Sequence, residues 1–248
     1  MSWQTASWRV TALAAASSLR PVYRRALAVW VVLAVLASTI MFFRMATDET
    51  PDRTSGTPDS AASSGGPGST QPGINLVVTP KSDATLEVTE SVLLDEPTES
   101  LKVRPPNFSA AGSTFAGKNP YASKVRIVAG DQSVQVADGV VNRPMTLDLD
   151  EPSRRFELRY ELNRAVVRSR PSAKGRALGA VRPLTSGMPD TLAVAVVVLG
   201  DEVRNLSCPG LSLEEQSCAV GAPPLLRLRT DLPWRTAIVV IQLDLKTS

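Results

Sequence analysis

The chain has 248 residues with 27 basic and 24 acidic side chains, which give a formal net charge of +3. It contains no histidine, which excludes histidine-dependent catalytic triads, Cys-His dyads and histidine metal sites. Beside a short tail, a membrane segment and a linker, about 175 residues remain, which is enough for one domain with a hydrophobic core or for two small domains, and one domain is the simpler interpretation.

A hydrophobic stretch near the N-terminus, Ala26 to Phe43, carries no charged side chain. A helix rises about 1.5 Å per residue, so this stretch covers about 27 Å, close to the hydrocarbon thickness of a bilayer. We therefore predict a single transmembrane helix over residues 26–45. A cleaved signal peptide is the alternative, but its apolar region usually has about 7 to 15 residues and ends at a small-residue cleavage site.

The charges around this stretch predict its orientation. Basic residues precede the span, whereas acidic residues accompany the arginines after it, and cytoplasmic flanks carry the excess of positive charge. We expect a plasma-membrane protein with residues 1–25 as a short cytoplasmic tail, either frayed or an amphipathic helix, and the rest outside the cytoplasm. The preceding basic residues are Arg9, Arg20, Arg24 and Arg25.

Residues 46–73 are dominated by Pro, Gly, Ser and Thr. Segments of this composition bury too little apolar surface to fold. We predict a disordered linker there, followed by an extracytoplasmic domain over residues 74–248.

The period of the hydrophobic pattern in this domain is two. Between Arg155 and Asn163, hydrophobic residues alternate with charged ones, as in a half-buried strand of an antiparallel sheet. The alternating hydrophobic residues are Phe156, Leu158, Tyr160 and Leu162.

Two runs, Thr191 to Leu199 and Ala237 to Ile241, are apolar on both faces, which is typical of central strands. Val125 to Val128 and Ser133 to Val136 flank a turn and predict a hairpin. About nine or ten such strands predict an all-β fold, an extracytoplasmic β-sandwich-like domain. The alternative is a mixed β fold with one short helix, for which 211–216 offers a single turn.

The stretch from Ile74 to Leu94 resembles the opening of extracytoplasmic β-domains in an uncharacterised bacterial family of predicted membrane proteins. Those domains open with a strand, an Asp-Gly turn and a strand of the form L-x-V-x-E. Asp83, Leu86, Val88 and Glu90 match this form, and Ala84 replaces the turn glycine. The resemblance covers about twenty residues and implies a β-hairpin, without any chemistry to transfer.

Cys208 and Cys218 are the two cysteines of the chain. Their spacing is not the C-x-x-C of redox proteins, so we expect a structural disulfide in an oxidising compartment. Free thiols or intermolecular pairing are the alternatives.

Residues 154–182 hold nine basic and two acidic side chains, so the domain is polarised in charge. Arginine makes bidentate contacts with phosphates and carboxylates, which favours a patch for an anionic partner. The competing interpretation is a solvated strand face followed by an exposed loop. The candidate patch residues are Arg164, Arg168, Arg170, Lys174 and Arg176.

The sequence contains no P-loop, no G-x-G-x-x-G and no S-x-x-K, and we assign no catalytic residue, metal ligand or cofactor. The leading hypothesis is a membrane-anchored binding or scaffolding protein of the bacterial cell envelope. It would recognise another envelope protein or an anionic envelope component, and nucleic acid is not an expected partner outside the membrane. The alternative is an envelope hydrolase or transferase with two carboxylates facing each other in a pocket.

Overall fold

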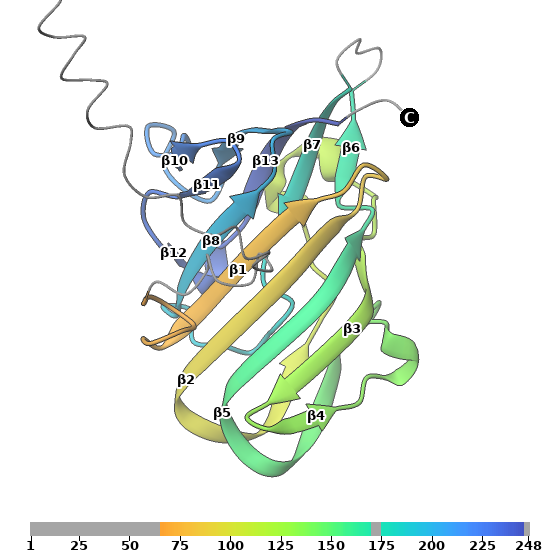
Figure 1. Cartoon of the computed structure of the whole chain (residues 1–248), viewed down its shortest axis with the longest axis vertical. Coiled ribbons are helices and arrows are strands. Elements are labelled where there is room, and N and C mark those ends of the chain that lie inside the picture. The colour runs from red at the N-terminus through yellow and green to blue at the C-terminus, as the bar shows by residue number, and fades with distance from the viewer. Residues whose placement is uncertain (1–64, 170–174, 246–248) are drawn as a thin grey trace, which may run out of the picture. The chain divides into compact units, whose positions relative to one another are not determined.

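The computed structural model describes residues 65–169 and 175–245, which belong to one compact unit (Figure 1). The predicted cytoplasmic tail, the transmembrane helix over residues 26–45 and most of the linker lie outside the described residues. No helix among the described residues is long and apolar enough to cross a membrane.

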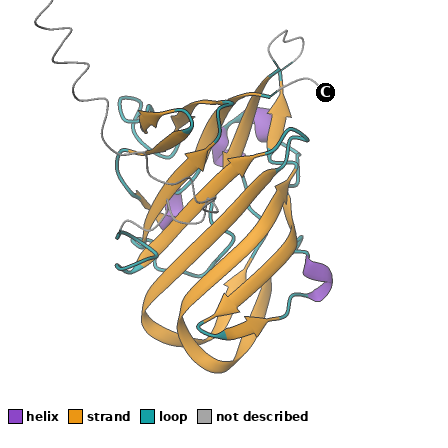
Figure 2. Cartoon of the chain, viewed as in Figure 1, coloured by secondary structure: helices purple, strands orange, loops and turns teal. Residues whose placement is uncertain are grey.

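The described residues form an all-β domain without α-helices (Figure 2). Its helical elements are short 3-10 turns, η2 (Ser109–Ala111), η3 (Ser113–Phe115), η4 (Ala137–Gly139) and η5 (Trp234–Thr236). The thirteen strands are β1 (Gly73–Pro80), β2 (Leu86–Val103), β3 (Tyr121–Ala129), β4 (Gln132–Val134), β5 (Met145–Asn163), β6 (Val166–Arg168), β7 (Arg176–Val181), β8 (Ala193–Leu199), β9 (Val203–Ser207), β10 (Ala219–Ala222), β11 (Leu225–Leu228), β12 (Leu232–Pro233) and β13 (Val239–Asp244).

The sequence predicted nine or ten strands, and this number was too low. The additional strands include β6 and β12, which have only three and two residues. So few residues do not complete a period-two pattern, and these strands form because longer neighbours offer them a pairing edge.

The strands form two sheets that pack as a β-sandwich-like body. The larger sheet has the order β10-β11-β8-β1-β2-β5-β3-β4, with β12 also paired to β8, and the smaller sheet has the order β6-β7-β13-β9. Leu76 and Val88 of the larger sheet share one hydrophobic core with Leu206 and Ile241 of the smaller sheet. The core therefore lies between the two sheets.

The predicted central strands lie where expected. Strand β8 lies between β1 and β11, and β13 lies between β7 and β9. The pair β1 and β8 is parallel, with Leu76 opposite Val196, so the larger sheet is mixed. All other strand pairs of the larger sheet are antiparallel.

The strand predicted from Arg155 to Asn163 forms the second half of β5, between β2 and β3. The predicted alternation is confirmed, because Phe156, Leu158 and Tyr160 are buried. The predicted hairpin is also confirmed, since β3 and β4 pair as antiparallel neighbours with Ala129 opposite Gln132.

The turn between β1 and β2 matches the hairpin implied by the family resemblance. Ala84, in the place of the turn glycine, has a positive φ of 67°. The Asp83 carboxylate accepts hydrogen bonds from the backbone N–H and the hydroxyl of Thr85, at 3.0 and 2.7 Å. The aspartate therefore fixes a turn whose next residue has a left-handed conformation that favours glycine.

Candidate functional site

A groove of about 1020 Å³ is lined by the loop between β2 and β3, by the segment before β5, and by Arg164 and Arg182, which follow β5 and β7. Four of its described lining residues are basic, and none is acidic. We call it the basic groove and define it by these four residues: Arg104, Lys118, Arg164 and Arg182. A concave surface lined by one sign of charge concentrates ions of the opposite sign.

Prolines keep the loops of this groove out of the sheets. Pro105, Pro106, Pro120 and Pro144 line it, and a proline has no backbone N–H to donate to a neighbouring strand. Phe108 and Phe115 hold the loop after β2 against the core, with both rings buried and their centroids 5.9 Å apart. The groove walls are thus irregular backbone fixed at a few hydrophobic points.

At one end of the groove, two arginines lie against the same aromatic ring. The guanidinium carbon of Arg104 is 5.3 Å from the Trp234 ring centroid, and that of Arg182 is 6.0 Å from it. Arg182 also donates a hydrogen bond of 3.3 Å to the Asn107 carbonyl. Burial, and next the positive charge of Arg104, lowers the pKa of the Arg182 guanidinium, which stays charged at neutral pH.

A buried carboxylate supports this end of the groove from inside the core. Glu90 of β2 is fully buried and accepts hydrogen bonds from the Leu184 N–H at 2.7 Å, the Thr185 N–H at 3.1 Å and the Thr185 hydroxyl at 2.6 Å. The Tyr160 hydroxyl donates a further hydrogen bond of 3.0 Å. Burial raises the pKa of Glu90, although these donors oppose the shift.

The loop held by Glu90 contacts both the tryptophan and the first arginine. The Thr185 carbonyl accepts a hydrogen bond of 3.3 Å from Trp234 Nε1, and the Arg104 N–H donates one of 3.0 Å to the Leu184 carbonyl. Glu90 therefore fixes the backbone that positions the two guanidinium groups.

The other end of the groove is more open. Arg164 has a positive φ of 58° at the end of β5, and its guanidinium carbon lies 5.7 Å from the Tyr121 ring centroid. Arg164 and Lys118 are exposed, so their charges are available to solvent and ligands.

The structure places one of the five predicted patch residues in the basic groove. Arg164 lies in the basic groove, whereas Arg168 lies outside its lining and donates a hydrogen bond of 2.9 Å to the Ser82 carbonyl. Arg176 is exposed on β7 and does not line the groove, and Arg170 and Lys174 lie outside the described residues. The five residues remain a prediction, of which the groove includes one.

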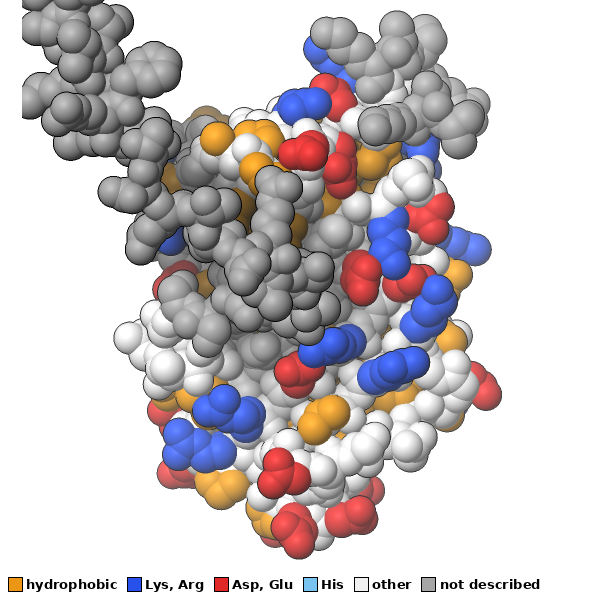
Figure 3. Space-filling view, in the orientation of Figure 1, with side chains coloured by type: hydrophobic (Ala, Val, Ile, Leu, Met, Phe, Trp, Pro, Cys, Tyr) orange, Lys and Arg blue, Asp and Glu red, His pale blue; other side chains and the backbone are white. Residues whose placement is uncertain are grey.

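On the face of the larger sheet seen in Figure 3, basic and acidic side chains are interspersed. Arg159 forms an ion pair with Glu157 at 2.7 Å, and Glu161 accepts from both Lys81 and Lys124. Charges of both signs on this strand face match the solvated alternative for the first part of the basic segment.

Sequence reasoning missed Arg104 and Lys118 and did not single out Arg182. A local signal was present, because Arg104 and Arg182 each precede a proline. Such a proline stops the ladder and leaves the preceding side chain at the rim of the sheet.

A smaller hollow of about 350 Å³ is lined by Asp148 and Asp150 of β5 and by Gln132 of β4. The two carboxylates are two residues apart on one strand, so they lie side by side rather than on opposite walls. The hydrolase hypothesis stays a prediction.

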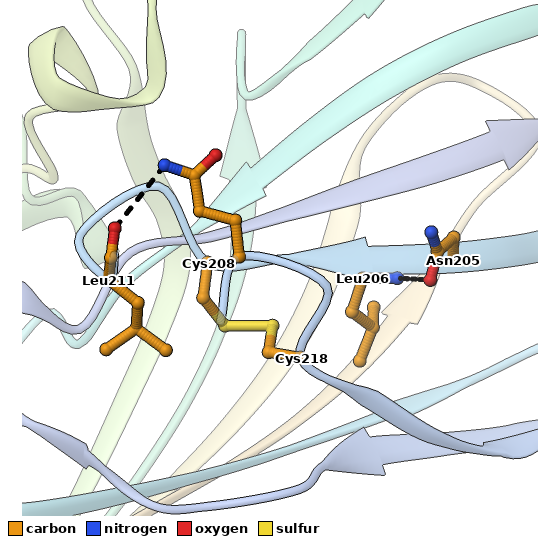
Figure 4. The surroundings of a disulfide bond; sticks show 6 residues. Asn205, Leu206, Cys208, Leu211 and Cys218 are labelled. Carbon is orange, nitrogen blue, oxygen red and sulfur yellow. Dashed lines mark hydrogen bonds between the residues drawn. A yellow bond between two sulfur atoms is a disulfide. The ribbon is translucent and has the colours of Figure 1, made fainter. Parts of the chain in front are cut away.

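The predicted disulfide between Cys208 and Cys218 is present (Figure 4). Both cysteines are buried, and the loop that they close includes Leu211, whose carbonyl accepts a hydrogen bond of 3.4 Å from the Gln216 side chain. The 211–216 segment is a turn rather than a helix, with the Glu215 N–H donating to the Ser212 carbonyl at 2.9 Å. The Ser212 hydroxyl bonds the Glu215 carboxylate instead of capping a helix.

No protein-family model and no curated protein matches this sequence. Among solved structures, similarity extends to an M1 zinc metallopeptidase from Deinococcus radiodurans, with 17% identity over 70% of this chain and a TM-score of 0.33. An aminopeptidase N family protein from Idiomarina loihiensis is 11% identical over 69% of this chain, with a TM-score of 0.40. This chain spans 42% and 29% of those two proteins, and neither likeness supports a functional conclusion.

Proposed function

We propose that this chain is a membrane-anchored, extracytoplasmic binding module whose basic groove holds an anionic component of the cell envelope or an acidic segment of an envelope protein. The observation that supports the proposal is the lining of the groove, which has four basic and no acidic residues among those described. A ligand in such a groove needs negative charge to compensate the four cations.

The membrane anchor and the orientation come from the sequence. The uncharged stretch from Ala26 to Phe43 and the arginines before it place the domain outside the cytoplasm in this proposal. In this proposal the segment between the predicted anchor and the domain tethers the groove, so its partners lie close to the membrane surface.

Binding of polyanions to the full chain tests the proposal. The chain is reconstituted in nanodiscs of zwitterionic lipid, and binding of polyphosphate and poly-glutamate is measured by calorimetry at several salt concentrations. We expect binding that weakens as salt rises, and a loss of about tenfold or more when all four groove cations are replaced by glutamine. The matched control is a variant with four exposed arginines outside the groove lining replaced: Arg126, Arg154, Arg227 and Arg229.

Crosslinking in intact cells identifies the partner. A photoreactive residue replaces Asn119, which is exposed at the groove, and in a control it replaces Thr230, which is exposed outside the groove lining. We expect a specific adduct from the Asn119 position alone. Equal adducts from both positions, or polyanion binding that survives loss of the four groove cations, would refute the proposed role of the groove.

A further inference from the structure

The basic groove has an anchoring subsite at its Trp234 end. We propose that Arg104 and Arg182 together bind a phosphate monoester group, and that the ligand of the groove therefore carries such a group. This inference rests on the proposed function and specifies the chemistry that the groove recognises.

No described carboxylate forms an ion pair with either arginine of this pair. Some other arginines do pair with carboxylates, as Arg204 does with Asp244 at 2.8 Å and Arg235 with Asp190 at 2.9 Å. Arg104 and Arg182 form no ion pair with any described residue, although both lie within about 6.0 Å of one ring centroid. Two like charges held together in a half-buried place repel each other unless an anion joins them.

The surroundings of the two arginines are fixed by buried hydrogen bonds. Trp234 is only 7% exposed and donates to the Thr185 carbonyl, and the Arg104 backbone is bonded to the Leu184 carbonyl. Glu90 holds both of these loop residues through buried hydrogen bonds. The site thus has its aromatic floor and its backbone fixed before a ligand arrives, which lowers the entropic cost of binding.

Two guanidinium groups require more negative charge and more acceptor atoms in a ligand than one guanidinium group does. A carboxylate or a phosphodiester offers one negative charge and two terminal oxygens, which a single bidentate guanidinium satisfies. A phosphate monoester carries a charge of about −1.5 to −2 at pH 7 and three terminal oxygens. It therefore matches both arginines at once, in charge and in acceptors.

The test uses the full chain in nanodiscs of zwitterionic lipid. Three soluble probes are titrated by calorimetry: glycerol 3-phosphate as the monoester, dimethyl phosphate as the diester and acetate as the carboxylate. We expect the monoester to bind at least about tenfold more tightly than the other two. Arg104→Gln and Arg182→Gln should each weaken monoester binding about tenfold or more, whereas Arg227→Gln should leave it unchanged.

Conservative variants keep the test valid if glutamine disturbs the fold. Arg104→Lys and Arg182→Lys keep the charge and the alkyl stem but lose the planar fork, so we expect intermediate monoester affinity with an unchanged unfolding temperature. The proposal would be overturned if the glutamine and lysine variants of both arginines fold and bind the monoester as tightly as the wild type.

A further experiment distinguishes a phosphate monoester on a membrane lipid from one on a soluble molecule. Nanodiscs that contain phosphatidic acid present the monoester on a lipid, and competition with glycerol 3-phosphate shows whether the groove takes it from the membrane or from solution. From either source, binding must depend on Arg104 and Arg182. Polyanion binding that depends on Lys118 and Arg164 but not on this pair would refute the subsite and leave the proposed function standing.

Discussion

The Thr185 hydroxyl donates a hydrogen bond of 2.6 Å to Glu90 Oε1 and joins the loop after β7 to the first half of β2 inside the core. The same carboxylate receives two backbone N–H groups and the Tyr160 hydroxyl, so one acidic side chain satisfies four buried donors. This arrangement ties the core of the larger sheet to the loop beneath the basic groove.

Replacement of Thr185 by valine should weaken this connection. The substitution keeps the shape of the side chain but removes one hydrogen bond to a charged group, which contributes about 1.5–3 kcal/mol. We expect the free energy of unfolding to fall by about this amount, measured by urea unfolding of the full chain in a nonionic detergent. Thr230→Val, at an exposed position, is the control and should change it by less than about 0.5 kcal/mol.

The pH dependence of stability should report the buried carboxyl. Burial raises the pKa of Glu90 above its usual value in the folded protein. The Glu90 carboxyl therefore stays protonated to a higher pH in the folded state than in the unfolded state. Stability that is present at low pH is then lost as the pH rises through the raised pKa.

Glu90→Gln removes this titration. Gln also replaces one carboxylate oxygen by an amide group that cannot accept from two of the four donors, so we expect the variant to be less stable than the wild type. We expect the difference in unfolding free energy between the wild type and Glu90→Gln to narrow as the pH rises from about 4.5. Urea unfolding at several pH values measures this difference. A difference that widens with pH would mean that the four donors outweigh burial and that the pKa of Glu90 is lowered.

The sequence pattern predicted the all-β class, the hairpin of β3 and β4, and the buried face of β5, because period-two alternation survives wherever one strand face is solvated. It did not predict the parallel pairing of β1 with β8. An apolar run such as 193–199 does not indicate whether the neighbouring strands run parallel or antiparallel to it.

The site was harder to predict because it is assembled from separate loops. Counting charges along the sequence finds basic residues that are close together in the chain. The four groove residues are far apart in the chain and line one surface only after folding: Arg104, Lys118, Arg164 and Arg182. Glu90 did carry a signal. Leu86, Val88 and Glu90 occupy alternate positions of one strand, so their side chains lie on the same face. The sequence therefore indicates a buried carboxylate that needs hydrogen-bond donors.

The turn between β1 and β2 offers a stabilising substitution. Ala84 adopts a φ of 67°, and a left-handed conformation costs a residue with a side chain about 1 kcal/mol relative to glycine. We expect Ala84→Gly to raise the free energy of unfolding by about 0.5–1 kcal/mol, less the entropy that glycine adds to the unfolded chain. Ala116→Gly, at a φ of −59°, should instead lower it by about 0.4–1 kcal/mol. Equal effects at both positions would contradict the strain at Ala84.

The disulfide should contribute to stability through the loop that it closes. Cys208 and Cys218 are ten positions apart, and closing a loop of about eleven residues stabilises the folded state by about 2–3 kcal/mol in the chain-entropy model. The double variant Cys208→Ser/Cys218→Ser should lose this amount in urea unfolding. Reduction of the disulfide in the wild type should lower the free energy of unfolding by the same amount. The reductant should not change the free energy of unfolding of the double variant.

The redox state of the same pair in cells tests the compartment in which the domain folds. A disulfide persists in an oxidising compartment and is reduced in the cytoplasm. Cells are quenched in acid, and the denatured protein is treated with a maleimide-polyethylene glycol reagent before or after reduction. We expect a gel shift only after reduction, because both sulfurs are bonded. A shift without reduction would mean free thiols and would contradict the extracytoplasmic placement on which the binding role depends.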